Sequence, residues 1–144
     1  MELSGLGIRW RYFGLLCATG CVAVFLGITT DKRFNAITAE HDKAAHFAVF
    51  ALESWLFTRS IVTRHVAVPG RWLQGGDVEQ GAQAARVSKY WVAGLACGAA
   101  AAVLSEVAQH VVSRGRRVFD VWDVACNAAG ALVGVGAAWW RERR

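Results

Sequence analysis

This chain of 144 residues is 55% hydrophobic, with a mean hydropathy of +0.30, which is too apolar for an ordinary soluble domain. Its formal net charge of +5 does not indicate nucleic-acid binding, because the basic residues stand in short flanks of apolar runs and form no single stripe. The four cysteines fall within those runs and lack CxxC spacing, so they are interpreted as small packing residues.

Four apolar segments predict four transmembrane helices, over residues 10–30, 44–62, 90–112 and 121–140. Each segment is long enough to cross about 30 Å of hydrocarbon at a rise of about 1.5 Å per residue. The second segment is the most polar, because it contains His46, Glu53 and Arg59. The sequence therefore predicts an all-α integral membrane bundle that forms a single domain over residues 1–144.

The segment 63–89 is rich in glycine, glutamine and charged residues, and it is interpreted as a flexible cytoplasmic loop. Four spans put this loop and both termini on one side of the membrane, and ten of the 16 lysines and arginines lie on that side. The positive-inside tendency then predicts that both termini are cytoplasmic. The sequence does not distinguish a plasma membrane from an organelle membrane.

Polar side chains inside the predicted spans recur at helical spacing. Residues three or four positions apart share a helix face, and the polar groups stand where the second and fourth spans begin and the third ends. All three groups should therefore meet at one depth on the non-cytoplasmic side. The groups are Asp42 with His46, Glu106 with Gln109, and Asp120 with Asp123 and Asn127.

Structural roles explain part of this pattern equally well. Asp42 and Asp120 stand at helix starts, where a carboxylate caps free backbone N–H groups. Glu106, Asp123 and Asn127 lie deeper, where an acid costs roughly 2.5–3.5 kcal/mol to insert unless it finds a partner. They could form interhelix hydrogen bonds, or they could bind a substrate or an ion.

Three motifs in this order, DKxxHF, SExxQ and RxFDxxDxxxNxxG, resemble those of the VanZ-like membrane protein family. They run from Asp42 to Gly130 and, with the flanking helices, cover most of the chain. The resemblance implies a small membrane protein of four helices, and it brings an association of one family member with resistance to the glycopeptide antibiotic teicoplanin. The matching positions are Asp42, Lys43, His46, Phe47, Glu106, Gln109, Arg117, Asp120, Asp123, Asn127 and Gly130.

These residues divide into two groups of candidates. A catalytic role is considered for His46, Asp42, Asp123 and Glu106, and substrate binding is assigned to Lys43, Gln109, Arg117, Asp120 and Asn127. No spacing is diagnostic of a metal site, so no metal ligand is assigned and the cofactor is left unknown.

The first functional hypothesis is a protein that binds or modulates the headgroup of an anionic lipid or of a cell-envelope precursor. The alternative is a membrane-embedded hydrolase or transferase that acts on a lipid-linked phosphate, with His46 as general acid or base. A third possibility is a bundle whose polar network only fixes the helix register. The expected partner is the lipid bilayer and not nucleic acid, and the oligomeric state is left open.

Overall fold

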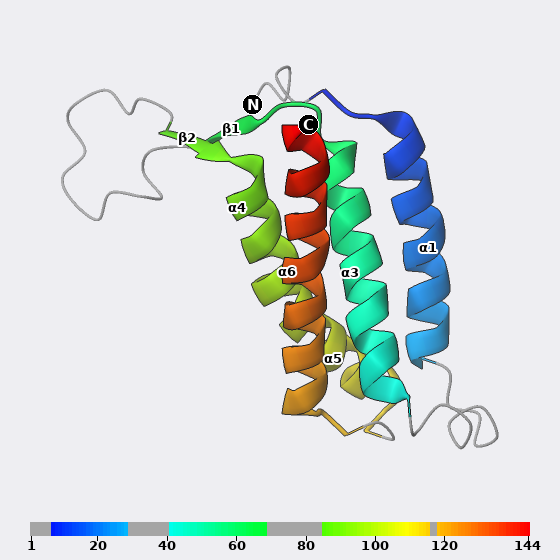
Figure 1. The fold of residues 1–144 in the computed structure, drawn as a ribbon. Helices are drawn as coiled ribbons and strands as arrows, with labels where there is room; N and C mark the ends of the chain where they lie inside the picture. The colour runs from blue at the N-terminus through cyan, green and yellow to red at the C-terminus, as the bar shows by residue number, and fades with distance from the viewer. Residues whose placement is uncertain (1–6, 29–40, 69–84, 116–117) are drawn as a thin grey trace, which may run out of the picture.

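The computed structural model describes residues 7–28, 41–68, 85–115 and 118–144. Within these ranges four helical columns stand side by side (Figure 1). Three are single α-helices, and the other is continuous through a π-helical segment, η2. The columns are α1 (Trp10–Ile28), α3 (Asp42–Ser60), α4 (Lys89–Leu95) with η2 (Ala96–Ala101) and α5 (Ala102–Val112), and α6 (Val121–Arg143).

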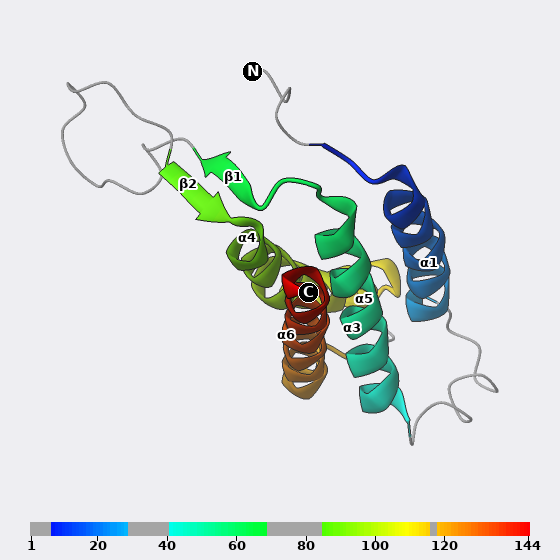
Figure 2. The same cartoon turned by 45° about the horizontal axis from the view of Figure 1, so that its top comes forward.

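The expected all-α membrane bundle is confirmed. Three helical stretches of the described chain are long and apolar enough to cross a membrane, namely Trp10–Gly27, Lys89–Val112 and Val121–Arg143. The fourth column, α3, is more polar, and it lies between α1 and α6 in both views (Figures 1 and 2). Its polar side chains are therefore covered by protein over much of its length, as intramembrane charges require.

The helix bounds differ from the predicted spans by at most three residues. Helix α3 begins at Asp42 and ends at Ser60, two residues earlier than predicted at each end. It ends at Ser60 because Ile61 adopts an extended conformation. The third column begins at Lys89, and α6 continues to Arg143. The last turn of α6 thus includes charged residues that the apolar pattern did not count.

The closest contact in the bundle is between α3 and α6, and two glycines of α6 permit it. A Cβ atom on Gly130 would lie 2.2 Å from the carbonyl oxygen of Phe47, and one on Gly134 would lie 2.1 Å from that of Ala51. Real Cβ atoms do not approach a backbone so closely. The two glycines therefore let the helix backbones pack directly against each other, which is the usual role of small residues in membrane helices.

The rest of the core is also built from small side chains. Ala93, Ala102, Ala131 and Ala138 are completely buried, whereas large apolar residues such as Trp10, Phe25 and Leu132 are exposed. This arrangement reverses that of a soluble protein and matches a bundle whose outer surface faces lipid.

The ends of the long loop form structure that the sequence interpretation missed. Strands β1 (His65–Val68) and β2 (Ala85–Ser88) pair antiparallel, with His65 opposite Ser88. The expectation of a flexible loop over 63–89 is therefore wrong for these two strands, and residues 69–84 lie outside the described part of the chain. Strand β2 leads directly into α4, so the hairpin fixes how the third column starts.

The bundle has two chemically different ends. Helices α3 and α6 begin, and α5 ends, at the bottom of Figure 1. We call this the His46 end. The start of α1, the two strands and the C-terminus lie together at the top, which we call the Glu142 end.

Candidate functional site

The imidazole of His46 is the centre of the polar group at the His46 end. It lies one turn into α3, yet its side chain is only 9% exposed. The close approach of α3 and α6 explains this burial, because Gly130 contacts the backbone of Phe47, the next residue after His46. Asn127, three residues before Gly130 on the same face of α6, is thereby brought against the imidazole.

One nitrogen of the imidazole is held by a buried hydrogen-bond chain. Nδ1 of His46 lies 3.0 Å from Oδ1 of Asn127. Asn127 donates from Nδ2 to Oγ of Ser105 at 3.2 Å, and Ser105 in turn donates to the carbonyl of Ala102 at 3.0 Å. The carboxylate of Glu106 lies 3.6 Å from the same Nδ1. Because Asn127 donates from Nδ2 to Ser105, its Oδ1 faces the imidazole, which assigns Nδ1 as the donor in this contact.

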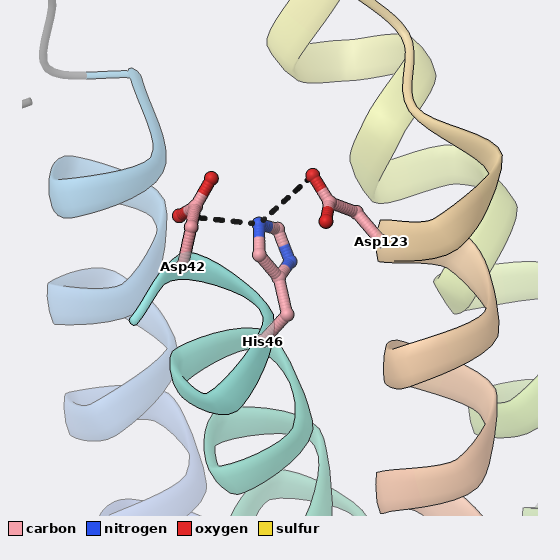
Figure 3. Close-up of side chains that lie close together, drawn as sticks. All are labelled: Asp42, His46 and Asp123. Atoms are coloured by element: carbon pink, nitrogen blue, oxygen red, sulfur yellow. Dashed lines mark ion pairs between the residues drawn. The ribbon is translucent and has the colours of Figure 1, made fainter. Parts of the chain in front are cut away.

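The other nitrogen points between two carboxylates from different helices. Nε2 of His46 lies 3.8 Å from Oδ1 of Asp42 and 3.8 Å from Oδ2 of Asp123. Figure 3 shows the ring of His46 directed into the space between them. The three residues together form a cluster of the kind that can hold a metal ion, with one ligand atom from each within 4.8 Å of the others.

Lys43 closes the group on its outer side. Its ammonium donates to Oδ2 of Asp120 at 2.9 Å and to Oδ1 of Asp123 at 3.0 Å. Asp123 therefore uses one oxygen for Lys43 and directs the other toward His46. Its side chain is 11% exposed, whereas that of Lys43 is 54% exposed, so the positive charge is outermost.

Asp120 has a second, structural role at the start of α6. Its Oδ1 accepts a hydrogen bond from the backbone N–H of Trp122 at 2.8 Å, as an N-cap residue does. The hydrogen bond from Lys43 and that from Trp122 hold the pKa of this carboxyl below its usual range. The capping interpretation is confirmed for Asp120. Asp42 instead lies in the first turn of α3, and the preceding residue, His41, is the N-cap.

The sequence-predicted residues are brought together in large part. Seven of the nine candidates lie in this cluster: Asp42, Lys43, His46, Glu106, Asp120, Asp123 and Asn127. The side-chain amide of Gln109 lies against Gly27 of α1, where an added Cβ would meet its Nε2 at 3.1 Å. Arg117 lies outside the described residues. Ser105, the first residue of the SExxQ motif, accepts the hydrogen bond that orients Asn127, a role that the motif alone does not indicate.

A second polar cluster, which the sequence reasoning missed, is centred on Glu142 at the opposite end. Oε2 of Glu142 lies 2.7 Å from the ammonium of Lys89 and accepts from the Tyr90 hydroxyl at 2.7 Å. Its Oε1 lies 3.0 Å from Arg9 and 3.4 Å from Arg59. One carboxylate on α6 thus connects the start of the chain, α3 and α4.

The buried position of Lys89 shows that this second cluster belongs to the interior of the fold. Its side chain is 0% exposed, and it donates to the carbonyl oxygen of Ile61 at 2.7 Å as well as contacting Glu142. The only sequence signal was that Glu142 is the single acid in an arginine-rich terminus. That pattern is equally typical of a solvated helix end, so it could not identify the cluster.

Comparisons with known proteins gave matches that cover most of the chain. A family model described as VanZ/LLP1 matches residues 20–142, a range that contains every polar residue of the site. The chain is also similar to an uncharacterised protein of Saccharomyces cerevisiae, with 47% identity over 116 residues, covering 81% of this chain and 94% of that protein. No solved structure matches the chain.

Proposed function

This chain belongs to the VanZ/LLP1 family, and we propose that it binds the phosphate-bearing headgroup of a membrane lipid at its His46 site. The proposal rests on the arrangement of charged side chains at the His46 end, where Lys43 is outermost. The carboxylates of Asp120 and Asp123 hold the ammonium of Lys43 in position, while the Lys43 side chain is still 54% exposed. A preoriented cation at the end of a membrane helix is well suited to contact a lipid phosphate.

A second exposed cation at the His46 end supports the same interpretation. Arg114, which is exposed, follows α5 at the same end of the bundle in a turn with positive φ, and Gly115 continues that turn. Phospholipids and lipid-linked envelope precursors share a phosphate group, and that group is the chemistry we assign to the site.

Binding of lipid by purified protein tests the proposal. In native mass spectrometry from detergent supplemented with phosphatidic acid, we expect wild type to retain one lipid molecule per chain. Lys43→Gln should reduce this occupancy at least about tenfold, since a hydrogen bond to a charged group contributes about 1.5–3 kcal/mol. Lys43→Arg should retain part of the binding, because it keeps the charge.

The matched control is Arg86→Gln, which removes one exposed positive charge from strand β2 at the Glu142 end. It should leave lipid occupancy within about twofold of wild type, because exposed charges this far away are screened. Equal occupancy in Lys43→Gln and Arg86→Gln would contradict lipid binding at the His46 site. A neutral diacylglycerol in place of phosphatidic acid distinguishes recognition of phosphate from recognition of the acyl chains.

The geometry of His46 supports one alternative, a hydrolase or transferase that acts on a lipid-linked phosphate. An imidazole that donates from Nδ1 to a fixed acceptor can accept a proton at Nε2, as a general base does. The discriminating measurement is turnover. Release of phosphate or exchange of the headgroup by wild type, with loss in His46→Gln, would favour the enzyme, whereas lipid retention without turnover favours binding.

We further propose that the His46 end faces away from the cytoplasm, on the strength of the ten lysines and arginines on the opposite side. In a background without the native cysteines, a Val118→Cys variant reports on this end, because Val118 is 81% exposed. We expect a membrane-impermeant maleimide to label it from outside intact cells or from the lumen of sealed vesicles. Labelling only after the membrane is opened would reverse the orientation.

A further inference from the structure

We infer that Asp42, His46 and Asp123 form a binding site for a divalent cation. They come from the start of α3 and the start of α6, which only the folded bundle brings together (Figure 3). Cation binding itself does not depend on the proposed function. The further step, in which the cation bridges the protein to a lipid phosphate, rests on the proposed lipid binding.

The hydrogen-bond chain at the back of His46 decides which ring nitrogen is available. Ser105 donates its hydroxyl proton to the carbonyl of Ala102, so its oxygen is an acceptor for Asn127. The amide of Asn127 must then turn its Oδ1 toward His46. With Nδ1 as the donor to Asn127, a neutral ring would carry its lone pair on Nε2.

That lone pair faces negative charge. Nε2 has no hydrogen bond among the described residues and lies 3.8 Å from one oxygen of each of Asp42 and Asp123. The side chain is more than nine-tenths buried, so bulk water does not screen the repulsion fully. A lone pair and two carboxylate oxygens directed at one point are stabilised when a cation occupies that point.

The distances and the supporting contacts suit a metal ion. Two donors that each lie about 2.1 Å from one ion are at most about 4.2 Å apart, and the two carboxylate-to-imidazole separations of 3.8 Å fall within that limit. Ligating histidines usually donate their other ring N–H to a carboxylate or carbonyl oxygen. Here the side-chain carbonyl oxygen of Asn127 supplies that acceptor at Nδ1.

The balance of charge gives the cation a function in lipid binding. Among the described residues, the carboxylates of Asp42, Asp120 and Asp123 lie around the ammonium of Lys43 and the imidazole of His46. This concentration of negative charge opposes phosphate binding, and a cation of charge two or more at the site would offset that repulsion. Three protein ligands leave further coordination positions open for phosphate oxygens.

The donor set indicates the class of cation. One imidazole and two carboxylates, without a thiolate, suit Zn²⁺ or Mn²⁺ better than Ca²⁺, which prefers oxygen ligands alone. Zn²⁺ is therefore the probe for the test. Full-length protein in detergent, stripped with EDTA and titrated calorimetrically with Zn²⁺, should bind one equivalent per chain.

Matched variants separate this site from adventitious binding. His46→Gln should weaken Zn²⁺ binding at least about 100-fold, whereas His65→Gln, on the exposed start of β1, should leave it unchanged. Asp42→Asn should weaken binding to a similar degree. Its control is Glu53→Gln, on the same helix but beside Gly20 of α1 and outside the cluster.

Absence of binding by wild type, or equal binding by His46→Gln and His65→Gln, would overturn the cation site. ¹⁵N NMR of the metal-free protein reports the protonation of His46. A doubly protonated ring, together with no Zn²⁺ binding, would show that a proton and not a metal ion lies between Nε2 and the two carboxylates. Lipid occupancy measured with and without Zn²⁺ separates the two proposals. If lipid binds equally well in EDTA, bridging by the cation is refuted, but the proposed lipid binding is not. If Zn²⁺ binds and no lipid does, the proposed lipid binding is refuted, but the cation site is not.

Discussion

Gly134→Val is expected to prevent α3 and α6 from packing and to lower the stability of the bundle by about 3 kcal/mol or more. A side chain at this position would meet the carbonyl oxygen of Ala51 at 2.1 Å and the backbone nitrogen of Trp55 at 3.0 Å. Both atoms belong to a helix backbone, so no side-chain rotation can relieve the overlap. Thermal unfolding in detergent, with the yield of monodisperse protein, measures the effect.

Gly136→Val is the matched control for this experiment. Gly136 lies two residues further along α6, and a Cβ there would meet nothing within 4 Å. Both variants replace a helical glycine by the same β-branched residue, so the helix-propensity terms cancel in the comparison. Equal melting temperatures for the two variants would mean that α3 and α6 do not make the close contact described above.

Glu142→Ala is expected to destabilise the bundle by about 3–5 kcal/mol, because it leaves the ammonium of Lys89 buried without its anionic partner. Arg9 and Arg59 lose the same partner, so the start of the chain and α3 are released from α6 together. The same thermal unfolding assay applies. Lipid occupancy should fall only in proportion to the unfolded fraction, because the His46 site lies at the opposite end.

Two further variants test whether the buried charge of Lys89 causes the loss of stability in Glu142→Ala. Arg141→Ala removes an exposed charge from the neighbouring position and should cost less than about 1 kcal/mol. Lys89→Met combined with Glu142→Ala removes the uncompensated ammonium and should recover part of the stability. If the double variant is no more stable than Glu142→Ala alone, the buried charge of Lys89 is not the cause.

Helical periodicity was sufficient to predict most of the His46 site. Asp123, Asn127, Gly130 and Gly134 recur every three or four residues, and that face of α6 is the one that packs on α3. Polar residues at the start of this stripe and glycines along the rest of it mark a helix face covered by another helix. Both features can be recognised in the sequence without knowing which helix packs on that face.

Contacts that depend on the order of helices in the bundle could not be predicted in the same way. Gln109 is only three residues from Glu106, yet it lies against Gly27 of α1, because α5 contacts α1 as well as α6. Glu142 meets Arg9 across 133 positions of sequence. No local pattern encodes such a pairing, since it follows from the relative position of helix ends.

The short strands were missed for a different reason. Each has only four residues, and β1 and β2 belong to the loop that joins the second and third helical columns. Their pairing is antiparallel and in register from His65 with Ser88 to Val68 with Ala85. Segments so short carry too little alternation to be distinguished from an irregular loop.

The π-helical segment Ala96–Ala101 determines which residues of α5 are directed inward. Hydrogen bonds from i to i+5 place more residues in each turn than i to i+4 bonds do, so the segment rotates all that follows it about the helix axis. Removal of one alanine from this segment would turn Ser105 and Glu106 by about 100°. The third column would still be apolar and long enough to cross the bilayer, but the imidazole would lose the contacts that fix its proton on Nδ1.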